Sequence, residues 1–442
     1  MYPQISLRLA IWQRNKELPR FLTQATWSWR YVIEPLDLNE AIDRIVSGIE
    51  PLPGEELVDL DTADNRVAAR DVIAAVDLPP FPSSAMDGIA VAASALAGAP
   101  PFELKIVGDS RAGHPFTAAA PLAANDCIRI FTGASLPPEL DCVVIQEDCE
   151  FHRDQPYARA TTHVRPEPGA NVRPVGHDVA AGERIISAGE RLNAFSVGWL
   201  SACGETKVAV RQRPKVSIFA TGDELREPGG ELEPGAIFES NRILLRRMLA
   251  RLPVEVADLG ILPDDPAVIH DALLNAAANS DLLITSAGVS VGEADFVTDV
   301  LQRIGTLEIW RLLIKPGKPL AFGRIKDCLF FGLPGNPVST AVTYLTVAQP
   351  ALLKLCGANR AAQPEFLALL ADDVQHKPGR EEFQRGVLEQ SGEKLIVRIT
   401  GDQSSNRLAS FHAANCLIRI PKAEGDLAAG TQVRVLPLGG IL

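Results

Sequence analysis

The chain has 442 residues, of which 46% are hydrophobic and 22% charged, so a folded protein of two to four domains is expected. Its formal net charge of -12 and the lack of a long basic stripe argue against general nucleic-acid binding. No apolar run approaches the roughly 20 residues that span a bilayer, and charges interrupt the first residues too often for a secretory signal. A cytoplasmic protein without a membrane anchor is therefore expected.

The cysteines and histidines do not form a metal-binding pattern. The sequence has seven of each, without a CxxC pair or an HExxH spacing, so neither a disulfide framework nor a zinc site is predicted. Cys127, Cys142 and Cys328 lie in apolar, strand-like runs and are predicted to be core residues. Soft ligands for any metal that the protein handles would have to come from somewhere other than its own side chains.

The first half of the chain predicts an extension, a helical start and a β-rich module. Residues 1–35 carry three tryptophans without a clean period. An amphipathic helix is predicted from Asp37 to Gly48, and a second helical piece over 61–71. Prolines then surround a polar turn at Asp87 and Gly88. Strands are predicted at Phe102–Val107, Cys127–Phe131 and Cys142–Gln146, followed by an irregular stretch with short strands between Arg165 and Arg191.

Strands and helices alternate between residues 214 and about 356. This order predicts βαβ units, with a mostly parallel sheet covered by helices on both faces. Ser240, Asp265 and Asn336 are predicted helix caps. The expected strands are Val216–Ala220, Val254–Leu259, Asp281–Thr285, Leu307–Leu312 and Cys328–Phe331. Beyond residue 363 the strand-like runs Phe366–Leu370, Lys394–Ile399, Cys416–Ile420 and Gln432–Leu436 favour a small β-barrel or sandwich.

Three loops of the α/β region should meet at the carboxyl edge of its sheet. They are Thr221–Leu225, Ser286–Asp295 and Gly332–Ser339. Small residues such as Ser290 let backbone N–H groups approach an anion, and carboxylates can hold Mg²⁺. Lys315 and Lys318, on a proline-stiffened loop, suit phosphate. The combination predicts a phosphoryl-transfer or nucleotide site, although each loop alone also fits an ordinary helix cap or a stiff solvated turn.

Nine ordered motifs resemble those of the molybdopterin molybdenumtransferases, the molybdenum insertases that include the E domain of gephyrin. The resemblance runs from about residue 36 to the end. No P-loop, Rossmann fingerprint or nucleophile elbow competes with it. The motifs are SSAMDGIAV (83–91), RIFTGASLP (129–137), VVIQED (143–148), NVRPVGHDV (171–179), SIFATGDEL (217–225), FESNR (238–242), SAGVSVGEADF (286–296), IKPGKPLAFG (314–323) and GLPGNPVST (332–340).

The resemblance implies a multidomain α/β plus β fold. Its expected parts are an N-terminal extension (1–35), an elongated linker and dimerisation domain (36–76 and 161–212), a β-rich domain (77–160), a doubly wound molybdopterin-binding domain (213–362) and a C-terminal β-barrel (363–442). It also implies a homodimer, with each cleft between the α/β domain of one protomer and the β-rich domain of the other.

The implied activity is Mg²⁺-dependent insertion of molybdate into adenylylated molybdopterin, with release of AMP. A molybdopterin adenylyltransferase and apo-molybdoenzymes are possible partners. By motif, the implied catalytic residues are Asp87, Thr132, Asp178, Glu224, Asp264 and Asp295, with Glu224 and Asp295 as metal ligands. The implied substrate-binding residues are Ser290, Arg311, Lys315, Lys318, Pro334, Pro337, Ser404, Ser405 and Ser410.

Several positions depart from the family pattern. Arg311 replaces a lysine, and Ala287 replaces the first glycine of GGVS, which would cost about 1 kcal/mol if that position needs φ > 0. Ile89, His177 and Asn406 also differ from the usual residues. Two alternatives stay open: a catalytically impaired pterin-binding or scaffold paralogue, since fold alone does not fix function, and a molybdopterin adenylyltransferase, whose fold resembles the α/β domain.

Overall fold

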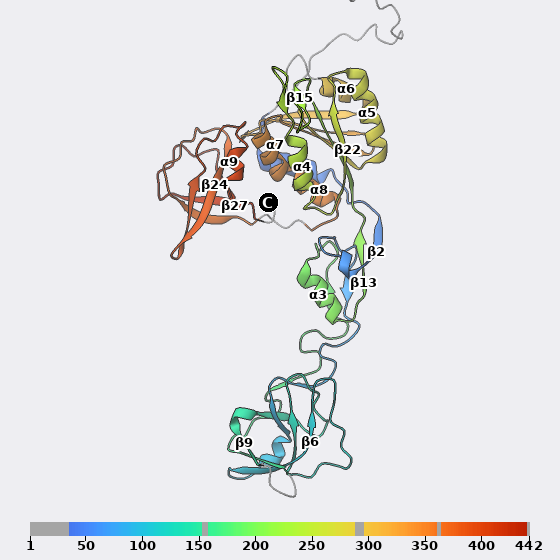
Figure 1. Ribbon diagram of the computed structural model, residues 1–442, viewed down its shortest axis with the longest axis vertical. Coiled ribbons are helices and arrows are strands. Elements are labelled where there is room, and N and C mark those ends of the chain that lie inside the picture. The colour runs from blue at the N-terminus through green and yellow to red at the C-terminus, as the bar shows by residue number, and fades with distance from the viewer. Residues whose placement is uncertain (1–34, 153–157, 288–295, 360–363, 440–442) are drawn as a thin grey trace, which may run out of the picture.

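The computed structural model describes residues 35–152, 158–287, 296–359 and 364–439. Figure 1 shows an elongated molecule, with an α/β unit and a C-terminal barrel at one end of the long axis and a β-rich unit at the other. A linker unit lies between them, and each unit contains buried apolar clusters of its own. This architecture confirms the expected multidomain α/β plus β fold. Within the described residues, no helix is long and apolar enough to cross a membrane.

The α/β unit is built on a seven-stranded sheet in the order β1-β19-β21-β22-β18-β14-β17. Four neighbouring strands, β22, β18, β14 and β17, run parallel, whereas β21 pairs antiparallel with both β19 and β22. The strands are β1 (Pro35–Leu36), β14 (Lys215–Thr221), β17 (Glu255–Leu262), β18 (Leu282–Ser286), β19 (Thr306–Leu312), β21 (Pro319–Ile325) and β22 (Cys328–Leu333).

Helices cover both faces of this sheet, as predicted. One face carries a large apolar cluster shared with α2, α4, α7, η4 and α8, and the other carries a cluster shared with α5 and α6. Strand β18 is buried along its whole length because it lies between these layers. The helices are α2 (Leu38–Ser47), α4 (Asn241–Leu249), α5 (Pro266–Asn279), α6 (Phe296–Ile304), α7 (Pro337–Thr343), the π-helical η4 (Tyr344–Ala348) and α8 (Gln349–Leu355).

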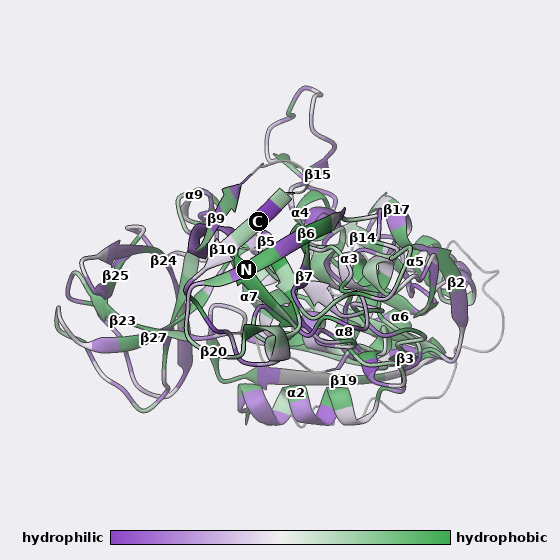
Figure 2. Cartoon of the chain, turned by 90° about the horizontal axis from the view of Figure 1, so that it is seen from below, coloured by the Kyte–Doolittle hydropathy of each residue, from purple (hydrophilic) through white to green (hydrophobic). Residues whose placement is uncertain are grey.

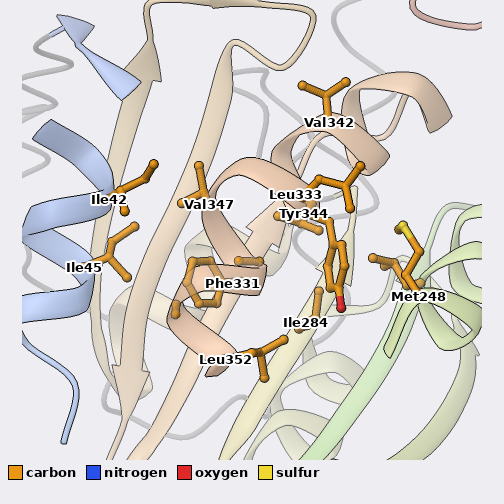
Figure 3. Packing of buried hydrophobic residues seen from close by; sticks show 14 of the residues in the cluster. Ile42, Ile45, Met248, Ile284, Phe331, Leu333, Val342, Tyr344, Val347 and Leu352 are labelled. Carbon is orange, nitrogen blue, oxygen red and sulfur yellow. The ribbon is translucent and has the colours of Figure 1, made fainter. Parts of the chain in front are cut away.

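Helix α2 belongs to the α/β core. Its apolar face includes Ile42 and Ile45, which Figure 3 shows on the same side of the core as Val347 and Phe331. Figure 2 shows α2 at an edge of the molecule beside β19, with hydrophilic and hydrophobic residues alternating along its turns. This packing differs from the prediction that all of residues 36–76 belong to the linker domain.

The linker unit consists of short paired strands and one helix. Strand β2 (Glu55–Asp59) pairs with β13 (Lys207–Arg211), β3 (Val72–Ile73) pairs with β12 (Arg184–Ile186), and α3 spans Ala194–Ala202. The predicted helix over 61–71 was wrong, since only the 3-10 turn η1 (Leu60–Thr62) forms there. Val67 and Ala68 instead bridge to Arg191 and Val210, so pairing between distant segments overrides the local helical pattern.

The β-rich unit contains a six-stranded sheet in the order β8-β5-β7-β6-β10-β9. Cys127 and Cys142 are fully buried in it, as predicted. A two-stranded pair, β4 (Ser83–Ser84) with β11 (Val172–Arg173), accompanies the sheet. The strands of the sheet are β5 (Gly88–Val91), β6 (Phe102–Ser110), β7 (Asp126–Ile130), β8 (Cys142–Ile145), β9 (Cys149–His152) and β10 (Ala158–Thr162), and η2 (Ala93–Leu96) and η3 (Gln146–Asp148) are 3-10 turns.

The C-terminal unit is a closed five-stranded barrel. It closes because β24 pairs with both β25 and β26. A short strand of the α/β unit, β20 (Ile314–Lys315), adds to β24 and joins the two units. The barrel strands are β23 (Phe366–Leu370), β24 (Glu381–Ser391), β25 (Lys394–Ile399), β26 (Cys416–Ile420) and β27 (Gln432–Pro437), with the short helix α9 (Ala409–His412) on the barrel.

Candidate functional site

A cleft of about 950 Å³ opens between the carboxyl ends of the parallel strands and the barrel. The last residues of β14 and β18, Thr221 and Ser286, line it, as does the loop Pro334–Pro337 that follows β22. The barrel contributes the segment Gln403–Asn406. Because open α/β sheets bind ligands where their strands end, this cleft is the candidate site.

Glu224 supplies a carboxylate to the cleft from the turn after β14. The turn depends on Gly222, whose φ is +147° and where a Cβ would lie 2.6 Å from Oε2 of Glu224. Asp264 lies beside this turn, since the Asp264 N–H donates to Asp223 Oδ1 and the Asp223 N–H donates to Asp264 Oδ2, each at 3.3 Å. Desolvation raises the pKa of Asp264, and the charges of Asp223 and Glu224 raise it further. The turn therefore concentrates negative charge.

This oxygen-rich, negatively charged turn fits a hard cation. In the described part of the chain no three His, Cys, Asp or Glu side chains gather as metal ligands. Mg²⁺ nevertheless needs only one or two carboxylates, because waters and substrate phosphates complete its shell. Glu224 meets that requirement, whereas Ser290 and Asp295 lie outside the described residues.

Three cationic side chains line the same cleft. Lys315 and Lys318 flank a Pro-Gly pair after β20, and Arg380 stands immediately before β24. The Nζ atom of Lys315 is 2.9 Å from Oε1 of Glu382, a barrel residue. Ammonium and guanidinium groups gathered in this way suit a phosphate or another oxyanion.

Polar side chains tie the walls of the cleft together. Asn336 donates from Nδ2 to Oγ of Ser405 at 3.0 Å, and Asn241 donates from Nδ2 to the Gly335 carbonyl at 2.6 Å. Asn336 was predicted to cap α7, but its side chain makes no cap bond. It links the loop after β22 to the barrel instead.

Glu239 is a cleft residue for which the sequence predicts no role. It is 3% exposed, and its Oε1 accepts the Arg242 N–H at 2.8 Å. Burial raises the pKa of Glu239. Ser240 was predicted to cap α4, yet its side chain makes no cap bond, because Glu239 satisfies the helix N–H from the preceding position.

Asp87 and Thr132 form a separate polar pair in the β-rich unit. Oδ1 of Asp87 accepts hydrogen bonds of 2.8 Å from both the N–H and Oγ1 of Thr132. These two bonds hold the pKa of Asp87 below its usual value. Asp87 directly precedes β5, and Figure 1 places the β-rich unit at the far end of the molecule from the barrel and α/β unit.

Three further predicted residues do not line the cleft. Asp178 is exposed, with its N–H bonded to the Leu78 carbonyl, and Arg311 is exposed on β19. Ser410 is buried under the cleft wall, where Oγ accepts a 3.0 Å bond from Nε of Arg385. The predicted residues that the cleft does gather are Glu224, Lys315, Lys318, Pro334, Pro337, Ser404 and Ser405.

The sequence carried partial signals for the cleft residues without an assigned role. Glu239 and Asn241 both belong to the FESNR motif, which matches the family but by itself assigns neither residue a role in the cleft. Arg380 and Gln403 lie in turns of the barrel, where polar residues are ordinary. Only the folded arrangement shows that these turns face the α/β unit.

Comparisons with known proteins cover nearly the whole described chain. Family models match residues 36–204 (MoeA N-terminal region, domain I and II), 217–354 (probable molybdopterin binding domain) and 368–438 (MoeA C-terminal region, domain IV). The chain is 37% identical to a molybdopterin molybdenumtransferase of Haemophilus influenzae, over 92% of this chain and 100% of the relative. A Nostoc protein of the same name is 33% identical, over 91% of this chain and 93% of the relative. A molybdopterin biosynthesis moeA protein of Pyrococcus horikoshii superposes with a TM-score of 0.79 at 29% identity, covering 91% and 100% of the two chains.

Proposed function

This chain belongs to the molybdopterin molybdenumtransferase family, and we propose that it inserts molybdate into adenylylated molybdopterin in a Mg²⁺-dependent reaction that releases AMP. As a member of this family it is a transferase of molybdenum cofactor biosynthesis. The proposal concerns the details of the reaction: the adenylylated substrate, the magnesium ion and the residues that act on them.

The cleft that combines Glu224 with Lys315 and Lys318 carries the proposal. The phosphoanhydride of the substrate bears negative charge, so ammonium groups would bind it and stabilise the charge that develops as water adds across the bond. The dithiolate of the pterin would supply the sulfur ligands for molybdenum. This source of sulfur is compatible with the seven free cysteines, of which six are buried and none lines the cleft.

Magnesium would bind at the Glu224 turn, with Asp295 as the second carboxylate implied by the family motif. When bound, the ion supplies charge neutralisation and orientation of the phosphates. The closeness of Asp223, Glu224 and Asp264 supports this location, because a cation would neutralise the negative charge that these carboxylates bring together.

A homodimer would complete each site. Asp87 and Thr132 lie in the β-rich unit, at the opposite end of the same chain from the cleft, so a partner copy would have to supply them. The linker unit exposes the apolar side chains of Phe195 (89%) and Leu57 (62%), which a two-fold contact between linker units would bury. Asp178, whose N–H bonds to the Leu78 carbonyl, is proposed to contribute near the same cleft.

The cellular setting follows from the chemistry of the substrate and product. An adenylyltransferase must supply the adenylylated pterin, and apo-molybdoenzymes must receive the product, so both are proposed partners. The chain is proposed to work in the cytoplasm, where these reactions would be linked.

The direct test combines purified protein with adenylylated molybdopterin, Mg²⁺ and molybdate. AMP release and activation of an apo-molybdoenzyme are followed together. Lys318→Ala should lower the rate of AMP release about 100-fold, because it removes a positive charge from the developing oxyanion. Glu389→Gln, on the exposed end of β24, is a control that should behave as wild type. Tight substrate binding without AMP release in the wild type would favour the impaired pterin-binding paralogue.

A further inference from the structure

A buried carboxylate of the barrel contacts one of the two cleft lysines. Lys315 ends β20 of the α/β unit, and its register partner in the parallel pair with β24 is Glu382. Their side chains also meet, with Nζ 2.9 Å from Oε1. The side chain of Glu382 is 2% exposed, whereas that of Lys315 is 47% exposed. The pair therefore runs from the barrel interior to the cleft.

Two more barrel side chains fix the orientation of Glu382. His376 places Nδ1 2.8 Å from Oε2, and Gln384 donates from Nε2 to Oε1 at 3.1 Å. The His376 side chain is 1% exposed. Its Nε2 has no hydrogen-bond partner in the described structure. If the ring proton lies on Nδ1 and is donated to Glu382, Nε2 is an acceptor, and no buried donor is left unpaired. Both carboxylate oxygens are thus engaged, which a buried charge requires.

Lys318 provides the contrast within the same loop. It lines the same cleft but has no ion pair among the described residues. A lysine has a long flexible stem and many rotamers, so an unpaired ammonium samples many positions. Lys315 differs because its ammonium pairs with a buried carboxylate that His376 and Gln384 hold in place.

We propose that Glu382 and His376 are positioning residues that hold the Lys315 ammonium in the cleft for its anionic substrate. The inference rests on the proposed function, in which Lys315 binds the phosphate or the oxyanion. It makes the barrel part of the catalytic machinery, because His376 and Glu382 act from the barrel on a lysine of the α/β unit.

The charge of Glu382 allows two roles to be separated: fixing the position of the Lys315 ammonium, and setting the net charge of the cleft. Replacing Glu382 with Gln removes a negative charge beside the cleft, so attraction of an anion should not weaken. The ammonium would lose its fixed location, and a misplaced catalytic group slows the chemical step. Glu382→Gln should therefore lower kcat about tenfold without raising KM for the adenylylated pterin.

The experiment measures lysine reactivity and kinetics on the full-length protein. Peptide mass spectrometry after brief treatment with acetic anhydride gives the acylation rates of Lys315 and Lys318. In Glu382→Gln, Lys315 should react several-fold faster relative to Lys318, since its amine is no longer held by the carboxylate. His376→Leu should also lower kcat. His376→Asn, which keeps an N–H near the position of Nδ1, should have a kcat close to that of the wild type.

Glu389→Gln is the matched control, because Glu389 lies on the same strand but is exposed. The inference is overturned if Lys315 reactivity is unchanged in Glu382→Gln, or if KM rises while kcat stays constant. It is also overturned if the control changes as much as Glu382→Gln. Absence of AMP release by the wild type would overturn the proposed function instead, and the acylation comparison would still decide whether Glu382 holds Lys315.

Discussion

Ala287 occupies a backbone conformation that favours glycine. Its φ is +108°, at the turn where β18 ends and the cleft begins. Ala287 replaces the first glycine of the GGVS pattern, and its positive φ shows that a glycine would fit this position without strain. Ala287→Gly should stabilise the protein by about 1 kcal/mol, because the Cβ strain disappears. Urea denaturation followed by circular dichroism measures the change.

Ala278→Gly is the control for that measurement. Ala278 is an exposed residue in the last turn of α5, where glycine adds backbone freedom to the unfolded chain and should destabilise by up to about 1 kcal/mol. Opposite signs for the two substitutions are expected. A loss of stability in Ala287→Gly would contradict the assignment of strain to this turn.

The Asp87–Thr132 pair gives a prediction about pH. Hydrogen bonds from Thr132 lower the pKa of Asp87, so the ionised carboxylate adds stability above its unfolded pKa of about 4, and that stability is lost as pH falls through the lower folded pKa. Thr132→Val removes the hydroxyl but keeps the N–H donor. The pKa of Asp87 should rise part of the way to its usual value.

A titration of ¹³C-labelled aspartate carboxyl groups by NMR measures this pKa directly, and Asp87→Asn identifies the resonance. The acid-induced loss of stability should also be smaller in Thr132→Val than in the wild type. An unchanged pKa of Asp87 would show that the hydroxyl bond contributes nothing in solution.

At the scale of elements, two predicted helix caps behave differently. Oδ1 of Asp265 accepts from the N–H groups of Ala267 and Val268 at the start of α5, whereas Ser240 makes no side-chain cap bond at the start of α4. Asp265→Ala should therefore destabilise by about 1 kcal/mol, and Ser240→Ala by much less. The free energy of unfolding of each variant tests the contrast. Equal losses would mean that Ser240 caps α4 in solution.

The helices and strands that the sequence predicted correctly are those whose apolar residues recur at a regular spacing. The α2 helix and strands β14, β18 and β22 bury regular apolar positions, so the sequence pattern predicted them. Strand β24 was missed because its buried positions include the polar and charged residues Glu382, Gln384 and Arg385, which interrupt the apolar pattern of a buried strand. Strand β21 was missed because Pro319 and Gly323 resemble loop residues.

The same limitation applies to the candidate site. Motifs predicted Glu224, Lys315 and Lys318, because loops after parallel strands converge by geometry. The contact of Lys315 with Glu382 depends on the barrel docking through β20, which no local pattern encodes. Cleft residues supplied by the barrel turns, such as Arg380, were missed for the same reason.

At the scale of the whole molecule, the extended shape separates the two proposed halves of the active site. Asp87 and Thr132 belong to the β-rich unit, and Glu224 belongs to the α/β unit at the other end of the chain. The linker unit between them consists of short strands and one helix and exposes Phe195. If copies associate through this linker, the β-rich unit of one can reach the cleft of the other.

This arrangement predicts complementation between inactive variants. In a mixed dimer of Asp87→Asn and Glu224→Gln, one cleft combines the intact α/β unit of the first chain with the intact β-rich unit of the second. Random exchange makes half of the dimers mixed, each with one intact cleft of two, so about a quarter of wild-type AMP release should return.

Unfolding and refolding the two variants together, compared with each refolded alone, measures the recovery. Adding Phe195→Glu to both chains should prevent it, because the charge would be buried in the contact between linker units. Analytical ultracentrifugation of this variant should then show monomers. No recovery from well-folded mixed dimers would mean that each chain builds its site alone, which would require the β-rich unit to fold back onto its own cleft.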